Sequence, residues 1–243
     1  MSHLRRTLME RHRDDLPADL LAEDTSLEDL VAGAWKARHR REEVEPLTML
    51  PELPAPIYVT TLYSRLLTRA LTDAGREPEV ELCRWHEDAN WPESVFEREP
   101  GYRPTPEHPL IYHLLKTFDE PESLVLTEDD SFDVLIGVTR NQDLVPKVVR
   151  RRLSDSALMF VGFRLDEWDF RVLYRSVMRS EGGRRANYTH VAVQVDPEEG
   201  ATIDAGRARE YLKSYFHSAR VSLYWGSTEH FAKELQDAWA ARR

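Results

Sequence analysis

The stretch Ile57-Tyr58-Val59-Thr60-Thr61-Leu62-Tyr63-Ser64 decides the fold. Its first five residues are apolar or β-branched and predict a buried strand. The next apolar residues recur at the spacing of one helical face and continue up to Gly75, a residue that commonly ends helices; they are Leu62, Leu66, Leu67, Ala70 and Leu71. A strand followed directly by a helix is the repeating unit of α/β proteins.

The same alternation continues outward from this stretch. Further strands are predicted over residues 80–85, 110–115, 158–163, 190–195 and 221–225, with helical patterns between most of them. This order predicts an α/β, Rossmann-like fold with a mostly parallel sheet and flanking helices. Ligands of such sheets bind beyond the carboxyl ends of strands, so we expect a site after Thr61, Leu115 and Val161.

A different pattern precedes the strand-rich part. Residues 1–45 are charged and carry leucines at roughly helical intervals, which predicts an N-terminal helical extension of two helices split near residues 24–26, with Ser26 as a cap. Residues 46–56 contain four prolines and predict an irregular link. We therefore divide the chain into a helical extension, residues 1–45, and an α/β domain, residues 46–243.

The charge balance bears on the class of partner. The 243 residues carry a formal net charge of −10, which argues against a protein that binds nucleic acid by neutralising phosphates. Two basic runs, residues 38–41 and 150–152, lie beside acidic residues in helical patterns and are interpreted as solvated helix faces.

Other function classes find no support in the composition. No apolar run approaches the roughly 18 residues that span a bilayer, and the N-terminus lacks the apolar centre of a signal peptide, so we expect a cytoplasmic protein. Cys83 is the single cysteine, which excludes an internal disulfide. His86, His108 and His113 have no recognised ligand spacing, so no metal is expected.

Three segments carry a resemblance to a known family. The opening stretch is followed by Ile111-Tyr112-His113-Leu114-Leu115-Lys116 and then by Leu158-Met159-Phe160-Val161-Gly162-Phe163-Arg164-Leu165-Asp166-Glu167-Trp168-Asp169-Phe170-Arg171. Together they resemble the SIR2-like (sirtuin-related) domains of bacterial conflict and antiphage proteins, which usually read T-T-N-Y-D, Y-H-L-H-G and L-G-Y-S-L-x-D-W-D-F-R in this order. The resemblance covers residues 46–243 and lacks the N-terminal Gly-Ala-Gly-x-Ser loop, which cradles the pyrophosphate in the family.

The resemblance implies an NAD site with altered residues. Thr60 and Thr61 match the turn of the first motif, but Leu62 stands where the family has the Asn that holds the nicotinamide ribose. Leucine can neither donate nor accept a hydrogen bond. Leu115 stands where the family has the histidine that acts as general base, and Lys116 replaces the following Gly.

Two polar residues leave alternatives open. His113 should lie on the strand face that carries Leu115, about 6 to 7 Å short of it, and is either a hydrogen-bonded structural histidine or a displaced base. Gly162, Phe163 and Arg164 match the segment that touches the ribose and phosphates in the family. Arg164 could pair with a phosphate or with Asp166 or Glu167.

These departures lead to two functional hypotheses. The first is a degenerate SIR2-like protein, catalytically impaired, that serves as an NAD-sensing or scaffold module in a bacterial defence system, with a protein partner or a second copy of the chain. The second is an NAD hydrolase that depletes NAD during infection and is completed by a partner subunit or by an N-terminal segment carrying the Gly-rich loop.

Overall fold

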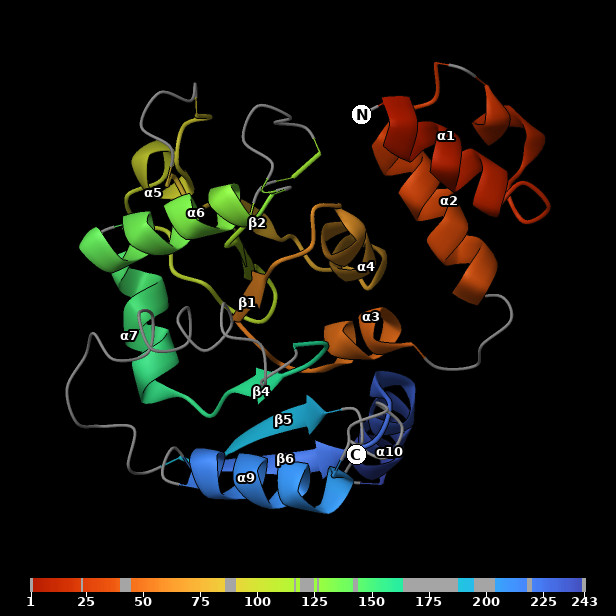
Figure 1. Cartoon of the computed structure of the whole chain (residues 1–243). Coiled ribbons are helices and arrows are strands. Elements are labelled where there is room, and N and C mark those ends of the chain that lie inside the picture. Colours follow the sequence, from red (N-terminus) through yellow and green to blue (C-terminus); the bar gives the residue numbers. More distant parts are fainter. Residues whose placement is uncertain are drawn as a thin grey trace. The chain divides into compact units, whose positions relative to one another are not determined.

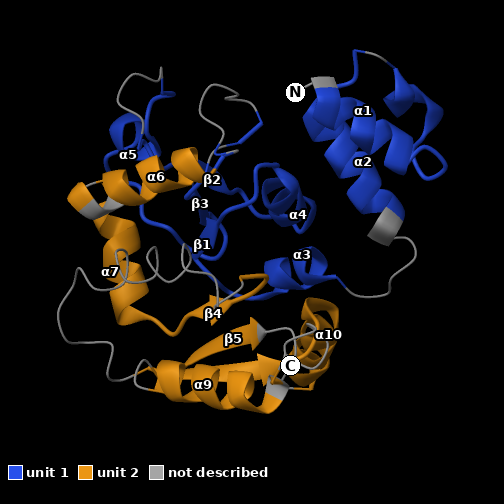
Figure 2. Cartoon of the chain, viewed as in Figure 1, with its two compact units in different colours: residues 1–127 blue, residues 128–243 orange. Residues whose placement is uncertain are grey.

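The computed structural model describes residues 2–22, 24–39, 45–85, 91–115, 117–118, 125, 127–141, 144–163, 188–194, 204–217 and 220–241. The chain forms two compact units, Met1–Thr127 and Glu128–Arg243 (Figure 2). Both units contain parallel strands and helices, which confirms the predicted α/β class. Among the described residues, no helix combines the length and the apolar character needed to cross a bilayer.

The strands and helices alternate as the sequence predicts (Figure 1). The predicted irregular link is wrong for residues 46–52, which form two short helices, because proline is tolerated in the first turn of a helix. The first unit contains α1 (Ser2–Arg11), η1 (Ala18–Leu21), α2 (Leu27–His39), α3 (Pro46–Met49), η2 (Leu50–Glu52), β1 (Ile57–Thr60), α4 (Leu66–Asp73), β2 (Glu79–Leu82), α5 (Val95–Arg98) and β3 (Leu110–His113). The second contains α6 (Glu128–Arg140), α7 (Lys147–Asp155), β4 (Met159–Phe160), β5 (His190–Gln194), α9 (Ala205–His217), β6 (Val221–Trp225) and α10 (Thr228–Ala240).

The sheet of the first unit has the strand order β1-β3-β2, and both pairings are parallel. The register aligns Thr60 of β1 and Leu82 of β2 with His113 of β3. All four residues of β3 are buried, as expected of a central strand in a parallel sheet. The carboxyl ends of the three strands therefore meet at one edge of the sheet.

An apolar cluster joins this sheet to α4. Tyr58 and Ile111 of the sheet pack with Leu67 and Leu71 of α4. Leu66 and Ala70 are buried as well, which confirms the predicted helical face over residues 66–71. The prediction that Leu62 begins this face is wrong, because Leu62 precedes α4 and is exposed. Because α4 follows β1 after only a short turn, this packing determines where the turn lies.

The N-terminal helices form an arm, residues 2–39, that is tied to the rest of the first unit. The Glu28 carboxylate accepts a hydrogen bond from the Arg65 amide at 2.8 Å, and Arg69 forms an ion pair with Asp29 at 3.1 Å. The Ser26 hydroxyl accepts from the Asp29 amide at 3.0 Å, which confirms Ser26 as a cap. Hydrogen bonds from Ser26 and then Arg69 hold the pKa of Asp29 below its ordinary value.

The sheet of the second unit has the order β4-β5-β6 and is parallel throughout. Helix α9 packs on β6 and helix α10 contacts β5 (Figure 1). Ala192, Phe216 and Val221 form the centre of this core. Strand β4 is shorter than the strand predicted over residues 158–163 and ends before Gly162, whose φ of 75° lies outside the extended region.

Candidate nucleotide site

The turn after β1 is closed by its own side chain. The Thr60 hydroxyl accepts a hydrogen bond from the Leu62 amide at 3.0 Å, and Thr60 is 6% exposed. Leu62 is 39% exposed and presents an apolar side chain. The exposed part of the turn at Leu62 therefore offers a ligand an apolar contact and no side-chain hydrogen bond.

His113 lies at the carboxyl end of β3, directly beside Thr60 in the register. Its ring Nδ1 is 3.0 Å from the Leu62 carbonyl oxygen, and the residue is 1% exposed. A carbonyl oxygen can only accept, so Nδ1 carries a hydrogen and donates it. The ring therefore links β3 to the turn after β1 through a buried hydrogen bond.

Tyr112, the neighbour of His113, is also enclosed. It is fully buried, and burial raises its pKa well above the ordinary value for a phenol, with a further contribution from Cys83 beside it. The hydroxyl group stays protonated at neutral pH and cannot act as a base. Neither polar side chain at the end of β3 is accessible to a ligand in solution.

The residues that follow β3 are still hydrogen-bonded to β1. The Leu114 amide donates to the Thr60 carbonyl oxygen at 2.9 Å. Leu115, at the family's base position, is half-buried. Lys116 lies outside the described residues. The structure thus brings five predicted site residues to one edge of the first sheet, namely Thr60, Thr61, Leu62, His113 and Leu115.

The remaining predicted residues belong to the second unit. A Cβ atom added at Gly162 would meet no atom of the described residues within 4 Å. The Phe163 ring packs edge to face on Phe160 at 6.5 Å and joins the core of the second unit. Arg164 lies outside the described residues, and so do Asp166 and Glu167, its two alternative partners.

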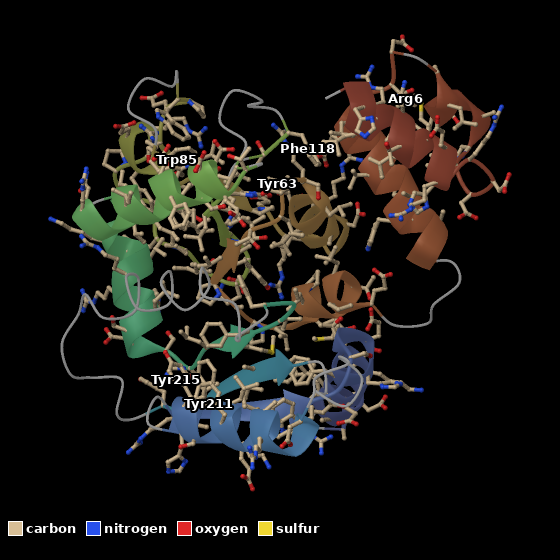
Figure 3. The ribbon with its side chains drawn as sticks, viewed as in Figure 1. Arg6, Tyr63, Trp85, Phe118, Tyr211 and Tyr215 are labelled. Carbon is tan, nitrogen blue, oxygen red and sulfur yellow. The ribbon has the colours of Figure 1, made fainter. Side chains whose placement is uncertain are left out.

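Three contacts at the β1 turn were not predicted from the sequence. The Tyr63 ring lies 5.9 Å from that of Phe118, and its hydroxyl donates to the Val125 carbonyl oxygen at 2.7 Å (Figure 3). The Glu28 carboxylate is bonded at the start of α4, next to the same turn. All three contacts join distant segments, so no local pattern signals them.

The described residues contain no group of three or more His, Cys, Asp or Glu side chains that could hold a metal ion.

A model of the SIR2-like domain family matches residues 56–219. The chain belongs to the SIR2-like domain family. The match begins directly before β1 and includes every predicted site residue. The family assignment and the parallel α/β architecture confirm the resemblance to SIR2-like domains and the Rossmann-like fold. A comparison with curated proteins finds no match.

SIR2-like domains are related to NAD in general, so the residues can be tested against that molecule. Gly162 has no side chain, and the described residues around it leave room for the close approach of a nucleotide. The side chains at the end of β1 and β3 do not fit a hydrolytic NAD site, because Leu62 carries no polar atom and His113 is enclosed.

Proposed function

We propose that this SIR2-like chain is catalytically impaired toward NAD and serves as an NAD-sensing or scaffold module in a bacterial defence system. The observation that carries the proposal is the enclosure of His113, whose Nδ1 donates to the Leu62 carbonyl oxygen. The defence setting follows from the family resemblance.

The enclosure of His113 argues against a displaced base. A general base must come within hydrogen-bond reach of the proton it removes, directly or through one water molecule. His113 is 1% exposed and its Nδ1 already donates to the backbone. A missing base lowers enzymatic rates by about 10² to 10⁴.

Leu62 argues in the same direction. The family's amide at this position orients the ribose and the attacking group, and its loss removes a hydrogen bond to a charge that develops during the reaction. A loss of this kind costs about 10² to 10³ in rate. The two losses act on one step and need not multiply, but either one leaves little turnover.

NAD binding can persist although the family's Asn and its general base are both replaced. Contacts between backbone and nucleotide do not depend on side-chain identity, and the space that the described residues leave at Gly162 is compatible with them. A domain that binds NAD without cleaving it can report the NAD concentration to a partner protein, which is the sensing role proposed here.

The test is release of nicotinamide from NAD by the purified full chain, with thermal unfolding followed in the same samples. We expect no release above buffer and a rise in Tm with NAD. Ligand at about 100 times its Kd stabilises a protein by about 2.7 kcal/mol, which raises the Tm of a chain this long by roughly 5 to 10 °C. A flat Tm without release would favour the scaffold role over the sensing role.

Release of nicotinamide by the purified chain would instead show that it is an enzyme. Release that is lost in His113→Ala and retained in the better-folded His113→Asn would contradict impairment and identify His113 as a positioning residue. Release that appears only after addition of a subunit carrying the Gly-rich loop would support the NAD hydrolase completed by a partner.

A further inference from the structure

The start of α4 has no cap of its own. Arg65 is the N-cap residue, and its carbonyl oxygen accepts the first helical hydrogen bond, from the Arg69 amide at 2.9 Å. A guanidinium group carries no acceptor, so the Arg65 side chain cannot bond the amides of the first turn, which have no partner within a helix. Leu66, Leu67 and Thr68 of that turn carry no negative charge. The sequence around α4 therefore does not supply the usual stabilisation of a helix N-terminus.

A carboxylate from the arm takes the place of this cap. In a capping box, the side chain of the third helical residue reaches back to the N-cap amide. The third residue of α4 is Thr68, whose hydroxyl has no hydrogen-bond partner in the described part of the chain. The N-cap amide, that of Arg65, donates instead to the Glu28 carboxylate of α2 at 2.8 Å. The arm thus performs a task that a capping box assigns to the helix itself.

The burial of Glu28 distinguishes this contact from the other polar contact between the arm and α4. Glu28 is 9% exposed, and its neighbours Leu27 and Leu30 are buried. Burying a carboxylate is unfavourable unless it is hydrogen-bonded, so the position of Glu28 depends on its bond to the amide. The ion pair of Asp29 with Arg69 is largely exposed and therefore weak. The buried bond is the stronger of the two.

The capped amide directly follows the turn after β1. The Leu62 carbonyl oxygen of this turn accepts from His113 of β3. The Tyr63 carbonyl oxygen accepts from the Phe118 amide at 2.8 Å. These bonds come from the α/β domain, whereas the bond at Arg65 comes from the arm. The conformation of the turn therefore depends on both parts of the first unit.

We propose that the arm is an autoinhibitory strap that keeps the turn after β1 closed. With Glu28 in place, the start of α4 is capped and the turn is held. When the arm leaves, the Arg65 amide loses this acceptor, and the turn opens together with the first turn of α4. The two events share one hydrogen bond, so each shifts the equilibrium of the other. The turn carries Leu62 of the candidate nucleotide site, so the arm controls how often this part of the site is open.

The control of a nucleotide site rests on the proposed function, because it requires that the turn contacts NAD. The coupling between the arm and the turn does not depend on NAD, and the experiment below contains none. The two proposals therefore fail separately. A chain that binds no NAD can still show the coupling, and a chain that binds NAD can lack it.

The test is hydrogen–deuterium exchange of the full chain at neutral pH, followed by mass spectrometry of peptides that cover residues 61–71. Glu28→Ala removes the acceptor of the Arg65 amide. Glu28→Gln keeps an oxygen at the same place, and Asp29→Asn removes only the exposed ion pair with Arg69. Peptides from the buried strand β3 serve as the internal reference, and circular dichroism establishes that each variant is folded.

We expect Glu28→Ala to speed exchange over residues 61–71 by at least about tenfold, as for the loss of a hydrogen bond to a charged group. Glu28→Gln and Asp29→Asn should stay within about threefold of the wild-type chain, and β3 should not change. Unchanged exchange over residues 61–71 in Glu28→Ala would overturn the proposal. Faster exchange confined to the arm would do the same, and an equal rise in β3 would show a general loss of stability instead of a local opening.

A second substitution separates the cap from the docking of the arm. Thr68→Glu, made in the Glu28→Ala chain, provides the capping-box glutamate from α4 itself. We expect exchange over residues 61–71 to return to within about threefold of the wild-type rate, whereas α2 keeps the faster exchange of Glu28→Ala. A folded double variant without restored protection would contradict the capping role of Glu28.

The reverse experiment decides the case if Glu28→Ala does not fold. Tyr63→Phe removes the hydrogen bond from the Tyr63 hydroxyl to the Val125 carbonyl oxygen and leaves the arm unchanged. Because coupling is reciprocal, loosening the turn should speed exchange in α2 by at least about twofold. Exchange in α2 that is the same in Tyr63→Phe and in the wild-type chain would refute the coupling.

Discussion

His113 connects two strands through a single hydrogen bond inside the core. The contact spans 51 residues of sequence and joins the end of β3 to the turn after β1. The donor is largely shielded from water, so removing the ring leaves both a cavity and a carbonyl without its partner. In this position the histidine contributes to stability whether or not the domain has any chemistry.

This role predicts a graded response to substitution. His113→Ala should lower the free energy of unfolding by about 3 kcal/mol. His113→Asn places an amide donor near the position of Nδ1 and should lose no more than about half of that amount. Urea denaturation of the two variants measures both values. Equal stability of His113→Ala and the wild-type chain would show that the bond to Leu62 contributes nothing.

At the level of secondary-structure elements, contacts from α2 hold the arm of residues 2–39 to the rest of the first unit. Glu28 of α2 is 9% exposed and accepts from the Arg65 amide at the start of α4, where the helix dipole favours a negative charge. Asp29 and Arg69 add an ion pair that is largely exposed and therefore weak. Trp35 of α2 donates to the Glu45 carboxylate at 2.6 Å, just before α3.

We expect Glu28→Ala to loosen the arm. The buried bond to a charged acceptor should be worth about 2 kcal/mol, and its loss should speed trypsin cleavage at the arginines of the arm. Glu28→Gln retains a side-chain oxygen as acceptor and is the matched control. The rate of cleavage, followed by mass spectrometry, distinguishes the variants. Identical rates for Glu28→Ala and the wild-type chain would mean that the arm is held by other contacts.

At the scale of the whole molecule, charge decides which partners are accessible. A net charge of −10 with an isoelectric point near 5.4 repels phosphate backbones at neutral pH. The arginines of α7 are partly paired within the helix, as Arg151 is with Asp155 at 3.7 Å.

This balance predicts that the chain does not bind nucleic acid. On a DNA-cellulose column at about 50 mM salt, where electrostatic binding is strong, the protein should appear in the flow-through. Retention that falls steeply with salt would show that the basic runs converge on one face. In that case Arg151→Gln, compared with an exposed control such as Arg207→Gln, would locate the contact.

Local patterns determined the elements. The apolar spacing of residues 66–71 predicted α4, Ser26 was predicted as a cap, and the strand–helix alternation predicted a parallel α/β fold, because each of these signals depends on neighbours in the chain. The altered residues at Leu62 and Leu115 were also visible in the sequence, and they support the proposed loss of activity.

Tertiary structure alone decided how the elements combine. The sequence could not reveal that β3 lies between β1 and β2, since strand order depends on contacts across the sheet. It left His113 open between a base and a structural residue, and it contained no sign of the bond from Arg65 to Glu28, 37 residues away. These features arise from hydrogen bonds between residues that meet only after the sheet has formed, whereas periodicity reports only on the nearest turns of the chain.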